Sequence, residues 1–174
     1  KLILVGLAVT AFIAAIKIAI QPSEFKITRS LKIPAKASKI FAQVNDLHNW
    51  NAWSPWARLD PNAKTSFSGS AKGQGASMSW DGNGEVGKGS MTIIESRANQ
   101  YIKFQMEFLK PMTATNNAEF TFTEDDGQTL VTWSSYGKNN FFAKAVSLLM
   151  NCDKMVGTQF EKGLVNLKEV VEGK

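Results

Sequence analysis

Near its C-terminus the chain reads DKMVGTQFEKGLVNLKEVV over residues 153–171, which has the period of a helix. Apolar side chains recur every three or four positions and share one helical face, while Lys and Glu occupy the other face. The apolar members are Met155, Val156, Phe160, Leu164, Leu167, Val170 and Val171. Asp153 stands where a helix N-cap is expected. The pattern predicts a long amphipathic helix whose apolar face needs a partner surface.

Upstream of this helix the sequence changes from a helical to an alternating period. Residues 100–108 alternate most regularly, with Phe104 and Met106 on one face and Lys103 and Gln105 on the other, which is typical of a half-buried strand. Strands are predicted over residues 24–33, 64–68, 76–81, 90–95, 100–108, 114–124 and 128–135, and short helices over 36–47 and 141–150. This order predicts an α+β fold in which a curved antiparallel sheet wraps the C-terminal helix and leaves an apolar hollow beneath it.

The N-terminal segment is apolar enough to enter a membrane. Residues 2–20 form a stretch of 19 residues in which Lys17 alone is charged. A helix of that length spans about 28 Å, close to the ~30 Å hydrocarbon core of a bilayer. Residues 1–21 are therefore predicted to be a single-pass membrane anchor and residues 22–174 the folded domain, on the non-cytoplasmic side of a bacterial membrane. The alternative is a cleaved signal peptide, which usually has a shorter apolar core and an Ala-x-Ala exit.

The basic excess of the chain does not indicate nucleic-acid binding. The chain has 20 basic and 15 acidic side chains, a formal net charge of +5. Two lysines lie in residues 1–21, which leaves 18 basic against 15 acidic groups, scattered without a Lys/Arg-rich window. A nucleic-acid partner requires a clustered phosphate-neutralising surface. One His and one Cys are too few for a Cys/His zinc site or an internal disulfide, so we expect no metal and no cofactor.

Isolated reactive residues and short motifs indicate structure more than catalysis. Residues 82–87 match the dinucleotide fingerprint GxGxxG, but a strand follows where a helix should, so a flexible hairpin is predicted. His48 is the sole imidazole and lies beside Asp46 at a helix end, where a capping or exposed role is expected. Cys152 has no evident activating partner. We assign no catalytic residue.

Three of the five tryptophans, Trp50, Trp53 and Trp56, fall within seven residues. Their spacing places the rings on one helical face until Pro55 disturbs it. They are predicted to form a satellite core under the first strand, because aromatic clusters usually pack together. The alternative is an aromatic wall at the membrane or the cavity mouth, since Trp favours interfaces.

Several stretches of the sequence carry a family resemblance. They are VNDLHNWNAWSPW at 44–56 and the segments 22–25, 108–111, 118–120, 132–133, 137–140, 153–157 and 160–164. The chain resembles, over residues 22–171, the START-like superfamily, also called the helix-grip or Bet v 1-like fold. It is most similar to bacterial polyketide cyclase/dehydrase-type SRPBCC proteins with an N-terminal hydrophobic segment. The resemblance implies a START-like domain over 22–174, preceded by a transmembrane helix.

The resemblance also implies a ligand site in the hollow under the C-terminal helix. Carried onto this chain, the ligand-binding residues are Met78, Trp80, Met91, Phe104, Met106, Phe108, Trp133, Phe141 and Met155, with Asn116 as a polar group among them. Such a lining suits an apolar ligand held by dispersion, with one amide to orient a polar end. The alternative is that the same residues simply pack against the helix as core.

Three functional hypotheses follow. The first is binding of a hydrophobic small molecule or lipid at a membrane. The second is an enzyme, a polyketide cyclase or dehydratase acting on a hydrophobic substrate, which would need an acid–base pair facing the hollow. The third is a ligand-free stress or accessory domain that contacts another protein through its sheet. An open cavity favours the first hypothesis and a filled interior the third.

Overall fold

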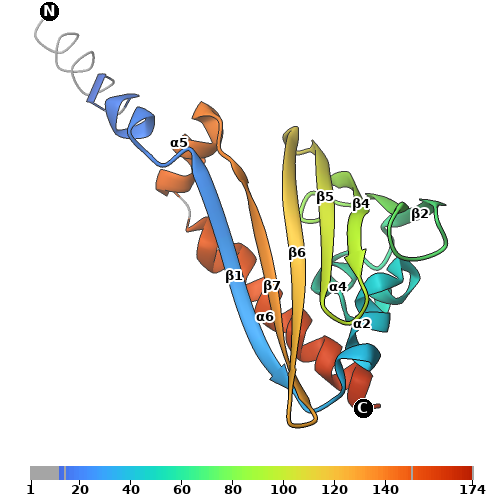
Figure 1. Ribbon diagram of the computed structural model, residues 1–174. Coiled ribbons are helices and arrows are strands. Elements are labelled where there is room, and N and C mark those ends of the chain that lie inside the picture. Colours follow the sequence, from blue (N-terminus) through green and yellow to red (C-terminus); the bar gives the residue numbers. More distant parts are fainter. Residues whose placement is uncertain (1–11, 14, 150, 174) are drawn as a thin grey trace, which may run out of the picture.

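The computed structural model describes residues 12–13, 15–149 and 151–173, and one curved antiparallel sheet organises it (Figure 1). Within the described residues seven strands are ordered β1-β7-β6-β5-β4-β3-β2. The strands are β1 (Glu24–Ile33), β2 (Lys64–Gly69), β3 (Ala76–Asp81), β4 (Lys88–Arg97), β5 (Tyr101–Lys110), β6 (Ala114–Asp125) and β7 (Gln128–Lys138). The helices are α2 (Ala37–Asn45), the 3-10 helix η1 (Leu47–Asn49), α3 (Trp50–Trp53), α4 (Pro55–Leu59), α5 (Phe141–Leu149) and α6 (Cys152–Glu172). The predicted α+β class, with a sheet around a long C-terminal helix, is confirmed.

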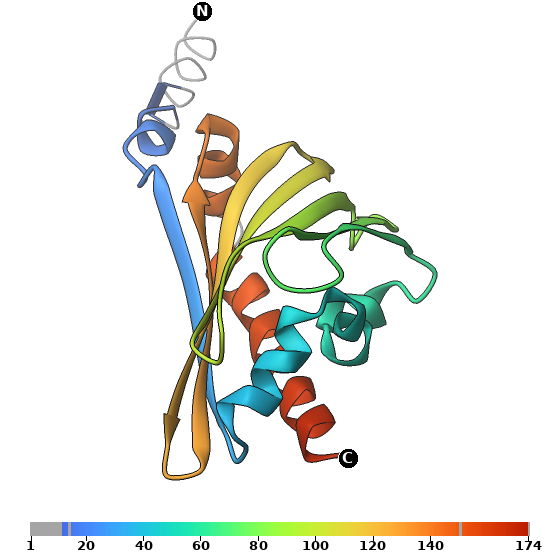
Figure 2. The same ribbon diagram turned by 45° about the vertical axis from the view of Figure 1, so that its right-hand side comes forward.

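The chain crosses the sheet once, between β1 and β2. Strands β2 to β7 each pair with the next strand in sequence, whereas β1 pairs with the last strand, β7. The short helical segments from α2 to α4 carry the chain from one sheet edge to the other. Figure 2 shows that these segments and α6 lie on the same, concave side of the sheet. That side carries the apolar faces predicted from alternation, because Phe104 lies opposite Ala118 and Phe120 opposite Trp133.

Helix α6 begins two residues before the predicted start at residue 154. Asn151 is its N-cap, and the side-chain Oδ1 of Asn151 accepts a hydrogen bond from the backbone N–H of Lys154 at 2.9 Å. The prediction of Asp153 as the N-cap is therefore wrong, and Asp153 lies in the first turn, where a negative charge favours the helix dipole. Gly173 ends the helix with a φ of 78°, a conformation that glycine adopts readily.

The core is aromatic, and Trp50 and Trp53 lie inside it. Both side chains are buried, and the ring centroid of Trp53 is 6.0 Å from that of Phe120. The indole N–H of Trp50 donates to the carbonyl of Val44 at 2.9 Å, which satisfies its polar atom away from water. The predicted satellite core is thus wrong for these two residues, because α3 turns them into the main cluster. Trp56, one turn further on, is half-buried.

An ion-pair cluster fastens the first half of α6 to β1. Arg29 lies on the concave face of β1, and its Nε donates to Glu161 at 2.7 Å and its Nη2 to Asp153 at 3.0 Å. Hydrogen bonds with Asp153 and then Glu161 raise the pKa of the Arg29 guanidinium, so the side chain stays charged. The guanidinium lies against Gly157, where a Cβ would collide with it. These contacts hold the start of α6 beside the sheet edge, in addition to the packing of Val156 against the core.

The predicted anchor, residues 1–21, lies largely outside the described residues, which begin at Phe12 and omit residue 14. Residues 15–19 are helical, and the backbone N–H of Ile20 still donates to the carbonyl of Ile16 at 3.0 Å. Within the parts of the chain that the structure describes, no helix combines the length and apolar content that a bilayer span needs. The anchor over residues 1–21 stays a prediction.

We expect Phe120→Ala to lower the free energy of unfolding by about 3–5 kcal/mol, because it opens a void in a fully buried aromatic cluster. Urea unfolding of the full chain, followed by tryptophan fluorescence, measures this change. Phe67→Ala is the matched control, since Phe67 is an exposed phenylalanine on the edge strand β2. Equal losses in the two variants would contradict the core described here.

We expect Arg29→Gln to increase amide hydrogen exchange in residues 152–161 while leaving residues 162–172 protected. The first half of α6 loses its ionic contacts with β1, whereas the second half keeps its buried apolar contacts. Hydrogen exchange with mass spectrometry resolves the two halves. The control is Lys168→Gln, which removes an ion pair within α6, that with Glu172 at 3.9 Å. Unchanged exchange in residues 152–161 would contradict the role given to the Arg29 ion pairs in holding the first half of α6.

Candidate functional site

A cavity of about 1540 Å³ lies between the concave face of the sheet and the first half of α6. All seven described strands contribute to its wall, and α3 to α6 cover it. Most of its exposed lining residues belong to three segments, residues 22–26 at the start of β1, 110–115 at the β5–β6 hairpin and 138–140 after β7. These segments therefore frame the mouth, at the end of the molecule where α5 lies (Figure 1).

The structure brings seven of the ten predicted ligand-binding residues into the cavity wall. They are Met78, Trp80, Met91, Met106, Phe108, Asn116 and Trp133. All seven side chains project from the concave face of β3, β4, β5, β6 or β7, as the alternation of residues along each strand predicts. Contact of these side chains with a ligand stays a prediction.

Three predicted residues lie elsewhere. Phe104 is fully buried in the core, where Trp50 covers it with a centroid distance of 5.4 Å. Phe141 begins α5 and is 58% exposed, and Met155 is 53% exposed on the outer side of α6. The helix presents Val156 and Phe160 to the cavity instead. The assignment of Phe104, Phe141 and Met155 to the cavity lining is therefore corrected.

The closed end of the cavity is an aromatic floor. The rings of Trp133 and Phe160 stack with centroids 4.2 Å apart and planes 10° apart, and the ring of Trp56 meets Trp133 edge-on at 5.7 Å. All three line the cavity. Sequence reasoning missed Trp56 and Phe160 as lining residues. The helical stripe of residues 153–171 contained Phe160, but the pattern did not indicate which part of the stripe faces an unfilled space.

Asn116 is a polar group on this apolar wall. It lies on β6 opposite Gly137 of β7, and a Cβ at Gly137 would collide with the side-chain Oδ1 of Asn116. The side-chain amide makes no hydrogen bond to any residue that the structure describes. It can therefore both donate to and accept from the polar end of a bound molecule.

Of the three carboxylates that line the cavity, Glu24 is exposed at the mouth, and the other two are engaged in structural contacts. Of the lining carboxylates, Asp153 pairs with Arg29, and Asp60 accepts hydrogen bonds from the backbone N–H of Asn62 at 3.1 Å and of Asn83 at 2.7 Å. His48 lies outside the cavity, where its Nδ1 is 2.9 Å from Asp46 Oδ1. Within the described residues no cluster of His, Cys, Asp and Glu could hold a metal ion. This arrangement suits the holding of an apolar molecule better than acid–base chemistry.

The fold is shared with solved structures of low sequence identity. The chain is similar to the crystal structure of protein MLL2253 from Mesorhizobium loti, with 10% identity, a TM-score of 0.64 and coverage of 86% of this chain and 98% of that chain. It is similar to the Aha1 dimer from Colwellia psychrerythraea, with 18% identity, a TM-score of 0.59 and coverage of 85% and 96%. CalU16 from Micromonospora echinospora matches with 14% identity, a TM-score of 0.57 and coverage of 84% and 75%. At these identities the likeness shows the fold alone. No curated protein sequence matches the chain.

The sequence itself matches a family model described as "Polyketide cyclase / dehydrase and lipid transport". The match covers residues 24–172, which is the whole sheet, the crossing helices and α6. The predicted resemblance to SRPBCC-type proteins is confirmed, and the chain belongs to the polyketide cyclase/dehydrase and lipid transport family.

Proposed function

We propose that this protein binds a hydrophobic small molecule or lipid in the cavity between the sheet and α6. The observation that carries the proposal is the volume of about 1540 Å³ beside a well-packed core. Typical small-molecule pockets measure about 300–1,000 Å³, so this cavity has room for a long acyl chain or a polycyclic ligand. A domain that only met another protein through its sheet would have no use for such a space.

The chemistry of the wall supports an apolar ligand with a polar end. Met78, Met91 and Met106 come from three adjacent strands, and their flexible thioether side chains adapt to irregular ligand shapes. The stacked rings of Trp133 and Phe160 offer a flat apolar floor. The amide of Asn116 supplies hydrogen bonds to orient a polar group.

Binding accounts for these contacts better than catalysis does. A cyclase or dehydratase would need an acid and a base that face the ligand, whereas Asp60 and Asp153 hold loops and α6 in place and Glu24 is exposed at the mouth. The enzymatic hypothesis therefore stays second.

A membrane location belongs to the same proposal. Residues 1–21 would form a single-pass anchor, with the domain on the non-cytoplasmic side of a bacterial membrane. Gln21 and Pro22, which follow the apolar stretch directly, line the cavity, so the anchor would keep the mouth near a source of lipid. Such tethering raises the effective concentration of a membrane-derived ligand.

The test is native mass spectrometry of the full chain after gentle purification. We expect retention of an apolar molecule, and binding of at least one member of a lipid panel after delipidation. A chain that retains no apolar molecule and binds no lipid from the panel would contradict the proposal.

We expect Met106→Asp to abolish ligand retention, because it places a carboxylate on the apolar wall. Gln105→Asp is the matched control, since Gln105 is the next residue on β5 and is half-buried on the opposite face of the sheet. Circular dichroism checks the fold of both variants, and native mass spectrometry counts the bound ligand. Full retention by folded Met106→Asp protein would show that the ligand lies elsewhere.

A further inference from the structure

Exposed apolar side chains gather around the mouth of the cavity. Leu109 is 53% exposed and Met112 43% exposed at the β5–β6 hairpin, and Phe141 is exposed at the start of α5. Ile20 is exposed at the end of the N-terminal helical segment. We call residues 20–22, 108–114 and 138–144 the rim. Figures 1 and 2 place all three parts at the same end of the molecule, and members of each line the cavity.

The rim is also basic. Its charged residues are Lys110, Lys138 and Lys144, and the nearest carboxylates, Glu24 and Glu107, lie just beyond its bounds. The Nζ of Lys144 donates to the carbonyl of Ala19 at 3.3 Å, which ties α5 to the N-terminal segment. Apolar side chains interleaved with lysines are the composition that enters the headgroup region of an anionic bilayer.

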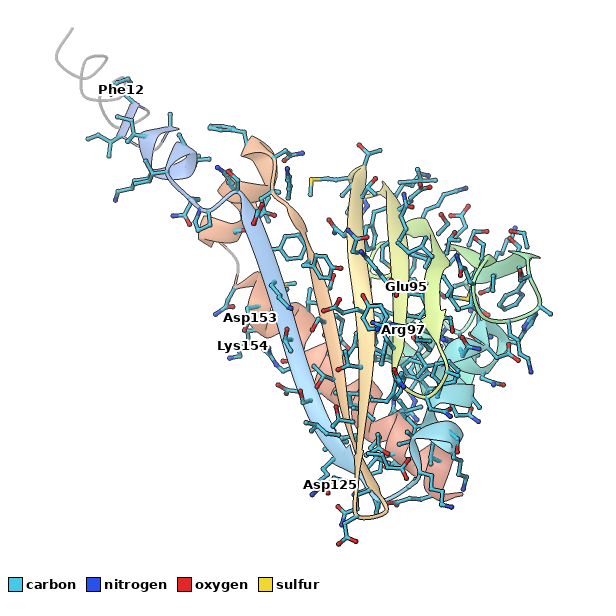
Figure 3. The ribbon with its side chains drawn as sticks, in the orientation of Figure 1. Phe12, Glu95, Arg97, Asp125, Asp153 and Lys154 are labelled. Carbon is cyan, nitrogen blue, oxygen red and sulfur yellow. The ribbon has the colours of Figure 1, made fainter. Side chains whose placement is uncertain are left out.

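The opposite end of the molecule has charges of both signs. The β6–β7 turn contains Asp125 and Asp126, and Figure 3 shows Asp125 at the far end from Phe12. Lys32 and Lys36 lie beside the same turn, because Lys32 pairs with Leu130 and the backbone N–H of Ala37 donates to Glu124. The lysines of the rim, by contrast, stand beside the exposed apolar side chains at the mouth.

The chain between the apolar segment and the domain is too short to hold the rim far from a membrane. The helical hydrogen bonding continues to Ile20, and β1 begins at Glu24. Residues 21–23 span at most about 11 Å even when fully extended. A bilayer that holds residues 1–20 would then lie within reach of the rim.

We propose that the rim docks on the surface of an anionic lipid bilayer, so that the cavity opens directly onto the headgroup region. Leu109, Met112 and Phe141 enter the interface, and the rim lysines contact lipid phosphates. The inference rests on the proposed function only in taking residues 1–21 as a membrane anchor. It adds a second membrane contact, made by the folded domain.

The experiment compares oxidation of two similarly exposed methionines in the full chain, Met112 on the rim and Met155 on the outer side of α6. The chain is reconstituted into phosphatidylcholine vesicles that contain one quarter phosphatidylglycerol, and hydroxyl-radical oxidation is read by peptide mass spectrometry. We expect Met112 to react several-fold more slowly than Met155 in these vesicles. The protection should weaken in pure phosphatidylcholine and at high salt, because the lysine contacts are screened.

Leu109→Glu is the test variant and Leu130→Glu its matched control, because Leu130 is an exposed leucine near the β6–β7 turn. Leu109→Glu should restore fast oxidation of Met112, and Leu130→Glu should not. Protection of Met112 that survives Leu109→Glu comes from ligand in the cavity and overturns the proposal. Equal oxidation of the two methionines in the wild-type chain also overturns the proposal. Protection of Met112 that grows with the ratio of protein to lipid overturns it as well, because a second copy of the chain then covers the rim.

Native mass spectrometry of the same samples separates this inference from the proposed function. Protection of Met112 without a retained apolar molecule supports docking of the rim on the bilayer and contradicts the proposed ligand binding. Retained ligand without protection of Met112 supports ligand binding and overturns the docking.

Discussion

The stack of Phe160 on Trp133 is the contact on which both halves of the molecule depend. It joins α6 to the middle of β7, and it is possible because Gly163, one turn further along α6, has no side chain: a Cβ there would lie 2.8 Å from the Trp133 ring. On one side of the stack Leu164 and Leu167 continue into a sealed core. On the other side the helix leaves the sheet and the cavity begins. One aromatic pair therefore serves as the edge of the core and the floor of the cavity.

A helix beside an unfilled space has fewer apolar contacts and needs other contacts to hold it. The first half of α6 meets this need through Arg29, whose guanidinium bridges Asp153 and Glu161 and lies against Gly157. These ionic contacts run along the sheet edge at β1, so they position the helix without filling the space over the inner strands. The aromatic core at one end of α6 stabilises the fold. The Arg29 ion pairs at the other end hold the helix in place and leave space for a ligand.

The same division extends to the surface. The mouth end has exposed apolar side chains beside lysines, whereas the β6–β7 end has charges of both signs. Membership in the polyketide cyclase/dehydrase and lipid transport family accounts for the sheet and α6. In our proposals, the rim and the apolar N-terminal segment link the ligand cavity to a membrane.

The sequence by itself determined the strands, the long C-terminal helix and the face of most strand residues, because alternation in residues 100–108 and the helical period in 153–171 are local properties of the backbone. The sequence also indicated the family to which the chain belongs. Alternation along the strands identified most of the residues that line the cavity wall. Only the tertiary structure decided the depth of each residue. Phe104 and Met106 have the same parity on β5, yet Trp50 seals the first into the core and leaves the second facing the cavity. Parity fixes which way a side chain points, but a distant segment decides whether anything fills the space in front of it.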